Sequence, residues 1–209
     1  NLKKGEVTRT ISTLEKVQTN VLKMKLEDLQ NMTVLGVGGF GLVSLCQHRQ
    51  TKEPYALKKM QKERIVEAQM QDMIVNEKNF LSQMKNPFVL GVCGTCQDRD
   101  SVYLVLEFLQ GGDLFGLLET KCTLNSTETQ FYMGCTIEAL AYVHSLNIAF
   151  RDLKLENLCL DKNGYCKLVD FGLAKRVLTR TYTVCGSPRY CAPEIVTGRG
   201  HCHFVDYWA

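Results

Sequence analysis

The sequence predicts an α+β fold in which a strand-rich first half is followed by a helical second half. Residues 32–60 carry β-branched and alternating apolar runs separated by glycines, the pattern of an antiparallel hairpin followed by a third strand. Residues 62–84 instead place apolar side chains at helical spacing. Two more strands are expected at Val89–Thr95 and Val102–Phe108, before Gly111-Gly112 interrupts the pattern.

The second half is expected to open with a long helix. Thr127-Glu-Thr-Gln130 fits a capping box, in which two polar side chains satisfy the first free amides of a helix. The side chains expected on its buried face are Phe131, Cys135, Ala139, Tyr142 or Val143, and Leu146. A short strand pair is expected to follow at Leu158–Leu160 and Cys166–Val169.

Composition indicates a globular protein without an extreme charge. Of the 209 residues 45% are hydrophobic, which is enough to bury a sizeable core. The net charge of +3, from 25 basic and 22 acidic residues, is too balanced to indicate binding of nucleic acid or a membrane surface. No apolar run approaches the roughly 18 residues of a membrane span, and the start at Asn1 has no signal-peptide pattern. We therefore expect an internal excerpt of a cytoplasmic protein.

The ten cysteines allow a structural or a metal-binding interpretation. A disulfide scaffold is typical of short secreted chains with weak cores, so we favour reduced thiols. Cys93 and Cys96 have the spacing of a zinc-ligand pair, but no second pair follows at the required distance, which favours simple packing. His201-Cys202-His203 could hold a metal only with further ligands.

A glycine-rich segment lies between the first two expected strands. Gly36-Val-Gly-Gly-Phe-Gly-Leu-Val43 has the pattern G-x-G-x-x-G-x-V, and without side chains its backbone amides can approach phosphate oxygens closely. A dinucleotide-binding fold would need a helix directly after the third glycine, whereas Leu42-Val-Ser-Leu45 continues as a strand. The candidate phosphate-binding residues are Gly36, Val37, Gly38, Gly39, Phe40 and Gly41.

Lys58 lies on the strand that follows this segment. Its ammonium group could neutralise nucleotide phosphates if a carboxylate oriented it, and Glu77 on the expected helix is the candidate partner. Each residue taken alone is more simply a solvated charge. Their order behind the glycine segment favours the functional interpretation.

A second group of polar residues follows the long helix, within Phe150-Arg-Asp-Leu-Lys-Leu-Glu-Asn157. Asp152 is placed where a carboxylate could accept a proton from a substrate hydroxyl. Asn157 and Asp170, the latter in Asp-Phe-Gly, supply the oxygen donors that Mg²⁺ prefers. Ala192-Pro-Glu194 closes this ordered set of motifs.

Together these motifs resemble those of eukaryotic protein kinases, over residues 29–209. Within that family the chain is similar to the AGC group, and most similar to cyclic-nucleotide-dependent kinases, especially the cyclic-GMP-dependent ones. The stretches that carry this resemblance are Leu35-Gly-Val-Gly-Gly-Phe-Gly41, Lys167-Leu-Val-Asp-Phe-Gly-Leu-Ala-Lys175, Thr181-Tyr-Thr-Val-Cys-Gly-Ser-Pro188 and Gly200-His-Cys-His-Phe-Val-Asp-Tyr-Trp208.

The resemblance implies a bilobal protein-kinase-like fold with a β-rich N-lobe and a helical C-lobe. The N-lobe would span residues 29–110, and the C-lobe would span residues 111–209 and stop at the start of its central helix. Residues 1–28 would be a linker or a regulatory segment, and Arg9-Thr-Ile-Ser12 within them could be an autophosphorylation or pseudosubstrate site.

The resemblance also implies Ser/Thr kinase activity with ATP and Mg²⁺. It assigns catalysis to Lys58, Glu77, Asp152 and Lys154, and magnesium binding to Asn157 and Asp170. Besides the glycine segment, it assigns ATP binding to Val43, Ala56, Lys58, Leu106, Glu107, Asp113 and Cys159. Leu81, Val92, Phe150 and Phe171 match the stack that joins the lobes in such kinases, although they could also be plain core residues.

Regulation by phosphorylation is a further implication. Thr183 matches the activation-segment acceptor, whose phosphate Arg151 and Lys175 would coordinate and so order the loop. The alternative is an ordinary loop threonine. Met73 replaces a third cationic residue, a histidine, of many relatives, so activation is expected to depend less on the phosphate.

Substrate recognition is implied for Asp113, Glu156 and Ser187, and it favours protein substrates with basic residues near the target Ser or Thr. Asp113 could instead bind ribose or be a solvated charge. Leu155 replaces the usual proline of the catalytic loop and Arg189 replaces a common acid, and both departures bear on peptide preference. A cyclic nucleotide would act through domains outside this chain.

Two alternatives to an active enzyme are a pseudokinase that only binds partners and an inactive kinase fragment. The intact Lys58, Asp152 and Asp170 argue against the pseudokinase. Asp206 is the expected anchor of the catalytic loop. If the chain stops shortly after it, Phe150 is expected to lack apolar support, and the fragment alone is expected to be inactive.

Overall fold

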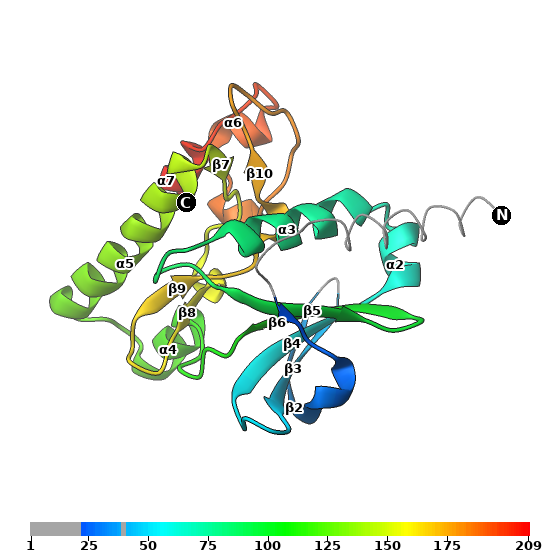
Figure 1. The fold of residues 1–209 in the computed structure, drawn as a ribbon. Helices are drawn as coiled ribbons and strands as arrows, with labels where there is room; N and C mark the ends of the chain where they lie inside the picture. The colour runs from blue at the N-terminus through cyan, green and yellow to red at the C-terminus, as the bar shows by residue number, and fades with distance from the viewer. Residues whose placement is uncertain (1–21, 39–40) are drawn as a thin grey trace. The chain divides into compact units, whose positions relative to one another are not determined.

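The computed structural model describes residues 22–38 and 41–209, and these form two compact units. The first unit contains the described residues up to Met84 together with Gly91–Phe108, and the second contains Lys85–Leu90 and Leu109–Ala209. The first is built around one sheet and the second is mainly helical, as Figure 1 shows for each. The α+β fold class is therefore confirmed.

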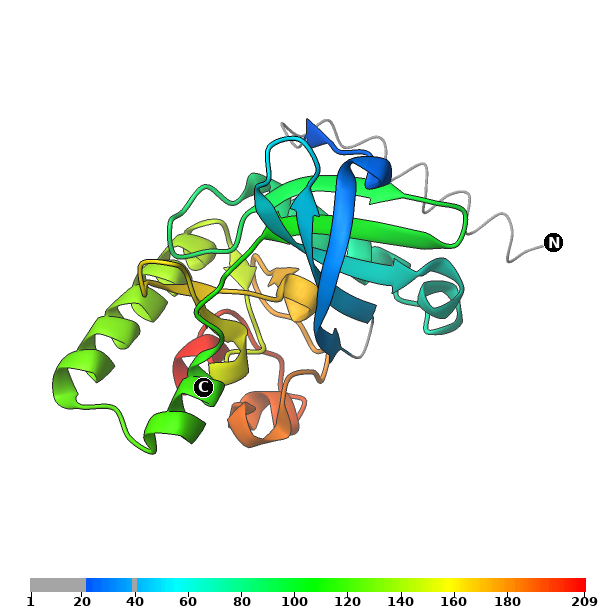
Figure 2. The same cartoon turned by 90° about the horizontal axis from the view of Figure 1, so that it is seen from below.

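The sheet of the first unit has six strands in the described residues, in the order β1-β5-β6-β4-β3-β2. All neighbours are antiparallel except β1 and β5, and Figure 2 shows the twist of the sheet. The strands are β1 (Leu22–Lys23), β2 (Leu29–Gly38), β3 (Gly41–His48), β4 (Pro54–Gln61), β5 (Val92–Gln97) and β6 (Ser101–Glu107). A short turn of 3₁₀ helix, η1 (Leu26–Asp28), precedes β2. Buried apolar side chains on one face form a core of Leu29, Cys46, Leu57, Tyr103 and Val105.

The segment predicted as one helix forms two, α2 (Lys62–Glu67) and α3 (Gln71–Gln83). Gln69 adopts a positive φ of 55°, a left-handed conformation that ends the first helix. The buried side chains of α3 are Ile74, Glu77, Lys78, Phe80 and Leu81. Ile74 is thus buried, whereas its neighbour Met73 is only half-buried.

The fourth strand begins later than predicted. Residues 85–90 belong to the second unit, where the amide of Leu90 donates to the carbonyl of Leu168 at 3.0 Å. The amide of Leu168 in turn donates to Phe88 at 2.8 Å, so β5 starts only at Val92. Residues 88–92 form one mainly apolar run, and no residue type within it marks the point where the hydrogen bonds pass from Leu168 to the sheet of the first unit.

The second unit contains the helices α4 (Leu114–Lys121), α5 (Ser126–Ser145), α6 (Pro193–Val196) and α7 (Val205–Trp208). Its short strands are β7 (Ile148–Ala149), β8 (Leu158–Leu160), β9 (Cys166–Leu168) and β10 (Lys175–Arg176). Strand β8 pairs with β9, and β7 pairs with β10. Single 3₁₀ turns lie at η2 (Leu155–Asn157), η3 (Phe171–Leu173) and η4 (Pro188–Tyr190). The predicted pair after the long helix is present and ends at Leu168.

The cap of α5 lies two residues before the predicted one. The side chain of Asn125 accepts from the amide of Glu128 at 2.9 Å, and the Glu128 carboxylate accepts from the amide of Asn125 at 3.0 Å. This reciprocal pair is a capping box, but with Asn125 in place of Thr127. The buried residues of α5 are Cys135, Thr136, Ala139, Leu140 and Val143. Phe131 is 43% exposed, so its predicted place in the core is wrong.

In the described part of the chain, no helix has the length and apolar character needed to cross a membrane.

Candidate active site

The first unit holds a buried ion pair between β4 and α3. Lys58 Nζ lies 2.6 Å from Glu77 Oε1, and the two side chains are only 13% and 2% exposed. Glu77 faces the sheet because it lies on the buried side of α3. The two residues that the sequence paired at a separation of 19 positions are therefore in contact. Burial strengthens the attraction and makes the loss of either partner costly.

The glycine-rich segment forms the hairpin between β2 and β3, with Gly38 opposite Gly41. A Cβ at Gly41 would lie 2.0 Å from the carbonyl oxygen of Lys59, so no other residue fits there. Gly36 has open space around it, and Val37 is 81% exposed. Gly39 and Phe40 lie outside the described residues. At Gly36 no side chain therefore shields the backbone of the hairpin.

The residues expected to contact adenine in this unit lie on neighbouring strands. Ala56 on β4 is opposite Leu106 on β6, and both are buried, at 9% and 7% exposure. Val43 on β3 is opposite Lys58, and it is half-buried like Glu107 at the end of β6. Leu81 is buried and Val92 half-buried within the same unit.

In the second unit, Asp152 is the centre of a hydrogen-bond network. Its Oδ1 accepts from the Ser187 hydroxyl at 2.8 Å and from the Ser187 amide at 3.1 Å. Its Oδ2 lies 2.8 Å from Lys154 Nζ and accepts from Asn157 Nδ2 at 3.0 Å. Lys154 Nζ also donates to the Ser187 hydroxyl at 2.9 Å. The carboxylate is therefore held in one orientation beside a hydroxyl, which is the contact that a base needs with a substrate alcohol.

The two candidate magnesium ligands are presented differently. The side-chain NH₂ of Asn157 donates to both the carbonyl oxygen and the carboxylate of Asp152, which leaves its Oδ1 as the remaining polar atom. Asp170 is exposed and has a φ of 62°, a conformation that a residue other than glycine rarely adopts. Its side chain accepts from the amide of Gly172 at 3.3 Å. An oriented amide oxygen and an exposed carboxylate are the donor types that suit Mg²⁺. No group of three or more His, Cys, Asp or Glu residues that could hold a metal occurs in the described ranges.

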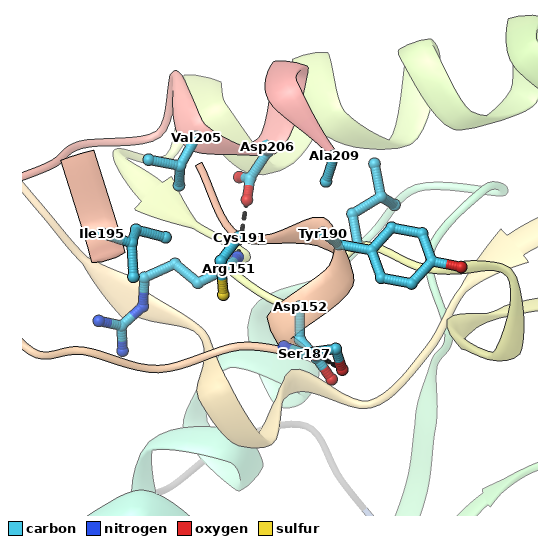
Figure 3. Close-up of a pocket in the computed structure, with 10 residues that line it drawn as sticks. Arg151, Asp152, Ser187, Tyr190, Cys191, Ile195, Val205, Asp206 and Ala209 are labelled. Carbon is cyan, nitrogen blue, oxygen red and sulfur yellow. Dashed lines mark hydrogen bonds between the residues drawn. The ribbon is translucent and has the colours of Figure 1, made fainter. Parts of the chain in front are cut away.

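Asp206 on α7 fixes the backbone in front of Asp152. Its carboxylate accepts from the amides of Phe150 at 2.8 Å and Arg151 at 2.7 Å, and it lies 2.7 Å from His144 Nε2. Figure 3 shows the contact with Arg151 and the guanidinium group turned away from Asp152 and Ser187. The prediction that Asp206 anchors the catalytic loop is confirmed at the level of these contacts.

The prediction that Phe150 lacks apolar support is wrong. Its side chain is 0% exposed, and its ring lies edge-on to that of Phe171, which is also 0% exposed, at 5.2 Å between centroids. Exposed aromatic side chains lie later in the chain, at Phe204, Tyr207 and Trp208.

Three further candidate site residues of the second unit are Asp113, Cys159 and Glu156. Asp113 caps α4, since its side chain accepts from the amide of Gly116 at 2.8 Å. Cys159 forms a backbone bridge with Asp113, and burial raises the pKa of its thiol to about 12, so the thiol stays protonated. Glu156 is exposed. All ten cysteines are free thiols, and Cys93 and Cys96 both lie in β5.

The two basic residues expected to coordinate a phosphate on Thr183 contact other groups in the unphosphorylated chain. Lys175 Nζ donates to the hydroxyl of Thr181 at 2.9 Å, and Thr181 is buried while Thr183 is exposed. Arg151 donates through Nε to the carbonyl of Leu173 at 2.9 Å. Sequence reasoning did not single out Thr181, which forms an antiparallel bridge with His201. Thr181 and His201 both lie in stretches that carried the resemblance, but no sequence pattern predicts that residues 20 positions apart pair with each other.

The first unit thus carries a buried ion pair and a glycine-rich hairpin, and the second carries an oriented carboxylate and two candidate oxygen ligands. Comparison with known proteins shows which class of protein has these features. Residues 29–209 match the protein kinase domain family, so the chain belongs to the protein kinases.

Relatives within this family are kinases controlled by cyclic nucleotides, as the resemblance predicted. The chain is 39% identical over 199 residues to cGMP-dependent protein kinase, isozyme 1, of Drosophila melanogaster, covering 93% of this chain and 26% of that protein. It is 37% identical over 210 residues to cGMP-dependent protein kinase 2 of Homo sapiens, covering 100% and 28%. It is 39% identical over 201 residues to a cAMP-dependent protein kinase catalytic subunit of Arthrobotrys oligospora, covering 94% and 39%. The chain therefore spans less than half the length of these relatives.

Proposed function

We propose that this chain is the catalytic part of a Ser/Thr protein kinase that transfers the γ-phosphoryl group of ATP to protein hydroxyls. The observation that carries the proposal is the orientation of Asp152, whose two carboxylate oxygens are held by Ser187, Lys154 and Asn157. The Ser187 hydroxyl at 2.8 Å occupies the place beside Oδ1 that a substrate hydroxyl would need. A carboxylate so held can take the proton of an attacking alcohol.

The reaction can be assigned to residues within each unit. Lys58, oriented by Glu77, would neutralise charge on the phosphates of ATP, and the glycine hairpin would offer its amides to them. Asp152 would accept the hydroxyl proton as the substrate oxygen bonds to the γ-phosphorus and ADP leaves. Lys154 would stabilise the transferring phosphoryl group from its position beside Asp152. Mg²⁺, held by Asn157 and Asp170, would supply further charge neutralisation when bound.

We also propose that Thr183 is phosphorylated during activation and that substrates carry basic residues near the target hydroxyl. Thr183 is exposed and is thus accessible to a kinase, whereas Thr181 is 5% exposed and already bonded to Lys175. Glu156 is an exposed acidic side chain one position before Asn157, which suits contact with a basic peptide. Control by a cyclic nucleotide would come from other parts of the protein, as the names of the relatives suggest, and the cytoplasm is the proposed location.

The activity is tested with the full-length protein and an Arg-rich peptide that contains one Ser. We expect Mg-ATP-dependent phosphorylation of the peptide, and loss of at least about 10²-fold in kcat for Asp152→Asn, because the amide cannot accept the proton. Glu156→Gln is the matched carboxylate control, which should weaken peptide binding with a smaller effect on kcat. Equal turnover by Asp152→Asn and the parent protein would reject the enzyme in favour of a binding module.

A further inference from the structure

Two buried side-chain nitrogens of the second unit have no hydrogen-bond partner. Among the described residues, three buried side-chain polar atoms lack one, and two of these are Arg151 Nη1 and His201 Nε2. Arg151 is 9% exposed and His201 is 4% exposed, so both side chains are largely shielded from bulk solvent. A buried donor without a partner costs roughly 1–3 kcal/mol, and such groups are rare in folded proteins. Two of them in one unit indicate a binding partner that is added later.

Hydrogen bonds of side chains and backbone bring Arg151 and His201 into one cluster with Lys175. Arg151 Nε donates to Leu173, two residues before Lys175, and Lys175 pairs in register with Ala149. Lys175 Nζ then donates to Thr181, and Thr181 exchanges two backbone hydrogen bonds of 2.8 Å with His201. The four residues are thus tied together from three separate segments of the chain.

The bridge between Thr181 and His201 depends on close packing of their neighbours. Gly200 has a φ of 81°, and a Cβ there would lie 2.6 Å from the ring of Tyr182. Glycine is therefore required beside His201, both for its left-handed backbone and for the space the ring occupies. This packing fixes the backbone of His201 against the activation segment.

The charges around His201 favour an anion. Burial lowers its pKa, and the positive charges of Arg151 and Lys175 lower it further, while Glu194 and Asp206 act in the opposite direction. The Asp206 carboxylate is already shared among the amides of Phe150 and Arg151 and the ring of His144. The cluster of Arg151, Lys175 and His201, called the cation cluster below, therefore combines two cations with two side-chain nitrogens that have no hydrogen-bond partner, and Glu194 and Asp206 are the carboxylates that face it.

Arg151 and Lys175 are the residues that the resemblance already assigns to a phosphate on Thr183. We propose that His201 takes up a proton when this phosphate binds and becomes a third cationic contact, which completes the cation cluster around it. The proposal rests on the proposed phosphorylation of Thr183, in which its hydroxyl oxygen gains the γ-phosphoryl group of ATP and loses its proton while ADP leaves. Thr183 is two residues from Thr181, so their Cα atoms lie within about 7 Å of each other. The phosphate would therefore be carried on the segment that Lys175 and His201 already contact through Thr181.

The third contact is specific to this chain. The resemblance implies that many relatives have a histidine four residues before the helix glutamate, where this chain has the uncharged Met73. His201 offers an imidazole from the segment after Ala192-Pro-Glu194 instead. A phosphate with a charge of about −1.5 to −2 and three acceptor oxygens can satisfy Arg151 Nη1 and His201 Nε2 together. The expectation that Met73 weakens the dependence of activation on the phosphate would then be reversed.

The proton uptake follows from linkage between two bound charges. Without phosphate, burial and the two cations lower the pKa of His201 and so favour its neutral ring. With phosphate, the added negative charge favours the protonated ring, and protonation in turn favours the phosphate to the same extent. His201 is thus a positioning residue that makes loop ordering depend on pH.

The test installs phosphothreonine at position 183 of the full-length protein by genetic encoding, in an Asp152→Asn background so that the phosphate does not depend on the protein's own activity. The titration of His201 is followed by NMR of its ring protons with Thr or phosphothreonine at 183. We expect the proton affinity of His201 to rise by about tenfold or more with the phosphate. Equal titration curves in the two forms would overturn the proposal, and no variant at His201 is needed for this readout.

A second readout uses the phosphate itself. The second pKa of phosphothreonine is near 6 in solution and falls beside cations, as ³¹P NMR can follow. His201→Gln keeps a donor but removes the charge, so the phosphate should titrate at higher pH in this variant. His203→Gln, two residues away, is the matched control and should leave the ³¹P titration unchanged. The same ³¹P curve for His201→Gln and the parent would also count against the cluster.

Failure of this inference and of the proposed function can be told apart. A protein with Asp152 intact that phosphorylates the Arg-rich peptide, while His201 ignores the phosphate on Thr183, rejects only the inference. A protein that shows the His201 response and has no transferase activity rejects the proposed function and keeps the cluster.

Discussion

The buried charges of the two units are arranged in opposite ways. Lys58 and Glu77 in the first unit lie 2.6 Å apart, and each has the partner that its burial requires. In the second unit, Arg151 and His201 are nearly as buried but keep unpaired donors beside Lys175. The paired site is complete as folded, whereas the cation cluster becomes complete only with an added anion. The difference separates a constitutive site from one that a covalent modification would finish.

The largest expected effect comes from breaking the paired site. Lys58→Met leaves the Glu77 carboxylate buried without its cation, which is expected to destabilise the first unit by about 3–5 kcal/mol and to abolish phosphoryl transfer. Denaturant unfolding of the full-length protein, with hydrogen exchange on α3, measures the stability. The double variant Lys58→Met, Glu77→Gln is the control and should recover most of the stability without the activity. A single variant as stable as the parent would show that the pair is not buried in solution.

A smaller loss is expected when the anchor of the catalytic loop is removed. Asp206→Ala takes the acceptor from the amides of Phe150 and Arg151, and each buried unpaired amide costs roughly 1–3 kcal/mol. Amide hydrogen exchange at these two positions should accelerate by at least about tenfold. Asp161→Ala is a comparison at an exposed turn, where Asp161 accepts from Asn163 and Tyr165, and it should leave exchange at Phe150 unaltered. Unchanged protection in Asp206→Ala would mean that other contacts hold the loop.

The unpaired site should respond with the opposite sign. His201→Phe removes a buried donor without a partner and keeps a planar ring, so the unphosphorylated protein is expected to gain up to about 1 kcal/mol. The protein with phosphothreonine at 183 is expected to lose stability from the same substitution. Thermal unfolding of the four proteins gives the coupling between the two positions. A destabilisation of equal size in both forms would assign His201 a purely structural role.

The smallest effect is a change of stability with pH. The pKa of His201 is lowered in the unphosphorylated fold, so the unfolded chain binds more protons and stability falls as the pH drops through the ordinary value of about 6.5. With phosphate on Thr183 the pKa of His201 is expected to be raised, and its contribution is then present at low pH and lost as pH rises through the folded value. Denaturant midpoints between pH 5.5 and 8 check both slopes against His201→Gln. Parallel pH profiles for the two forms would contradict the predicted coupling.

The candidate catalytic residues could be singled out from the sequence because each is marked by neighbours at fixed spacing. Asp152, Asn157 and Lys154 lie within six positions, and their network follows from that closeness. Lys58 and Glu77 are 19 positions apart, but the strand and the helix that carry them were recognisable from their periodicity. Their contact is as predicted, while their roles in catalysis stay predictions.

Other features could not be predicted because they depend on contacts between distant segments. The start of β5 is one example. Leu90 belongs to the same apolar run as Val92, but its amide bonds to Leu168 in the second unit, so β5 begins only after it. The N-cap of α5 is Asn125 and not Thr127. Both residue types are common at helix N-termini, so the sequence alone does not decide between them. His201 was considered only as a metal ligand, since its bridge to Thr181 spans 20 positions without a local pattern.

The Asp206 anchor has a consequence for synthesis of the protein. The Asp206 carboxylate binds amides that precede it by 55 and 56 positions. At about 5–20 residues per second, a ribosome adds this length in about 3 to 11 s. During that time Arg151 and Asp152 have left the ribosome without the group that fixes their backbone. The catalytic loop should therefore acquire its native shape only after Asp206 has been synthesised, and nascent chains that end between Asp152 and Asp206 are the ones most in need of chaperones.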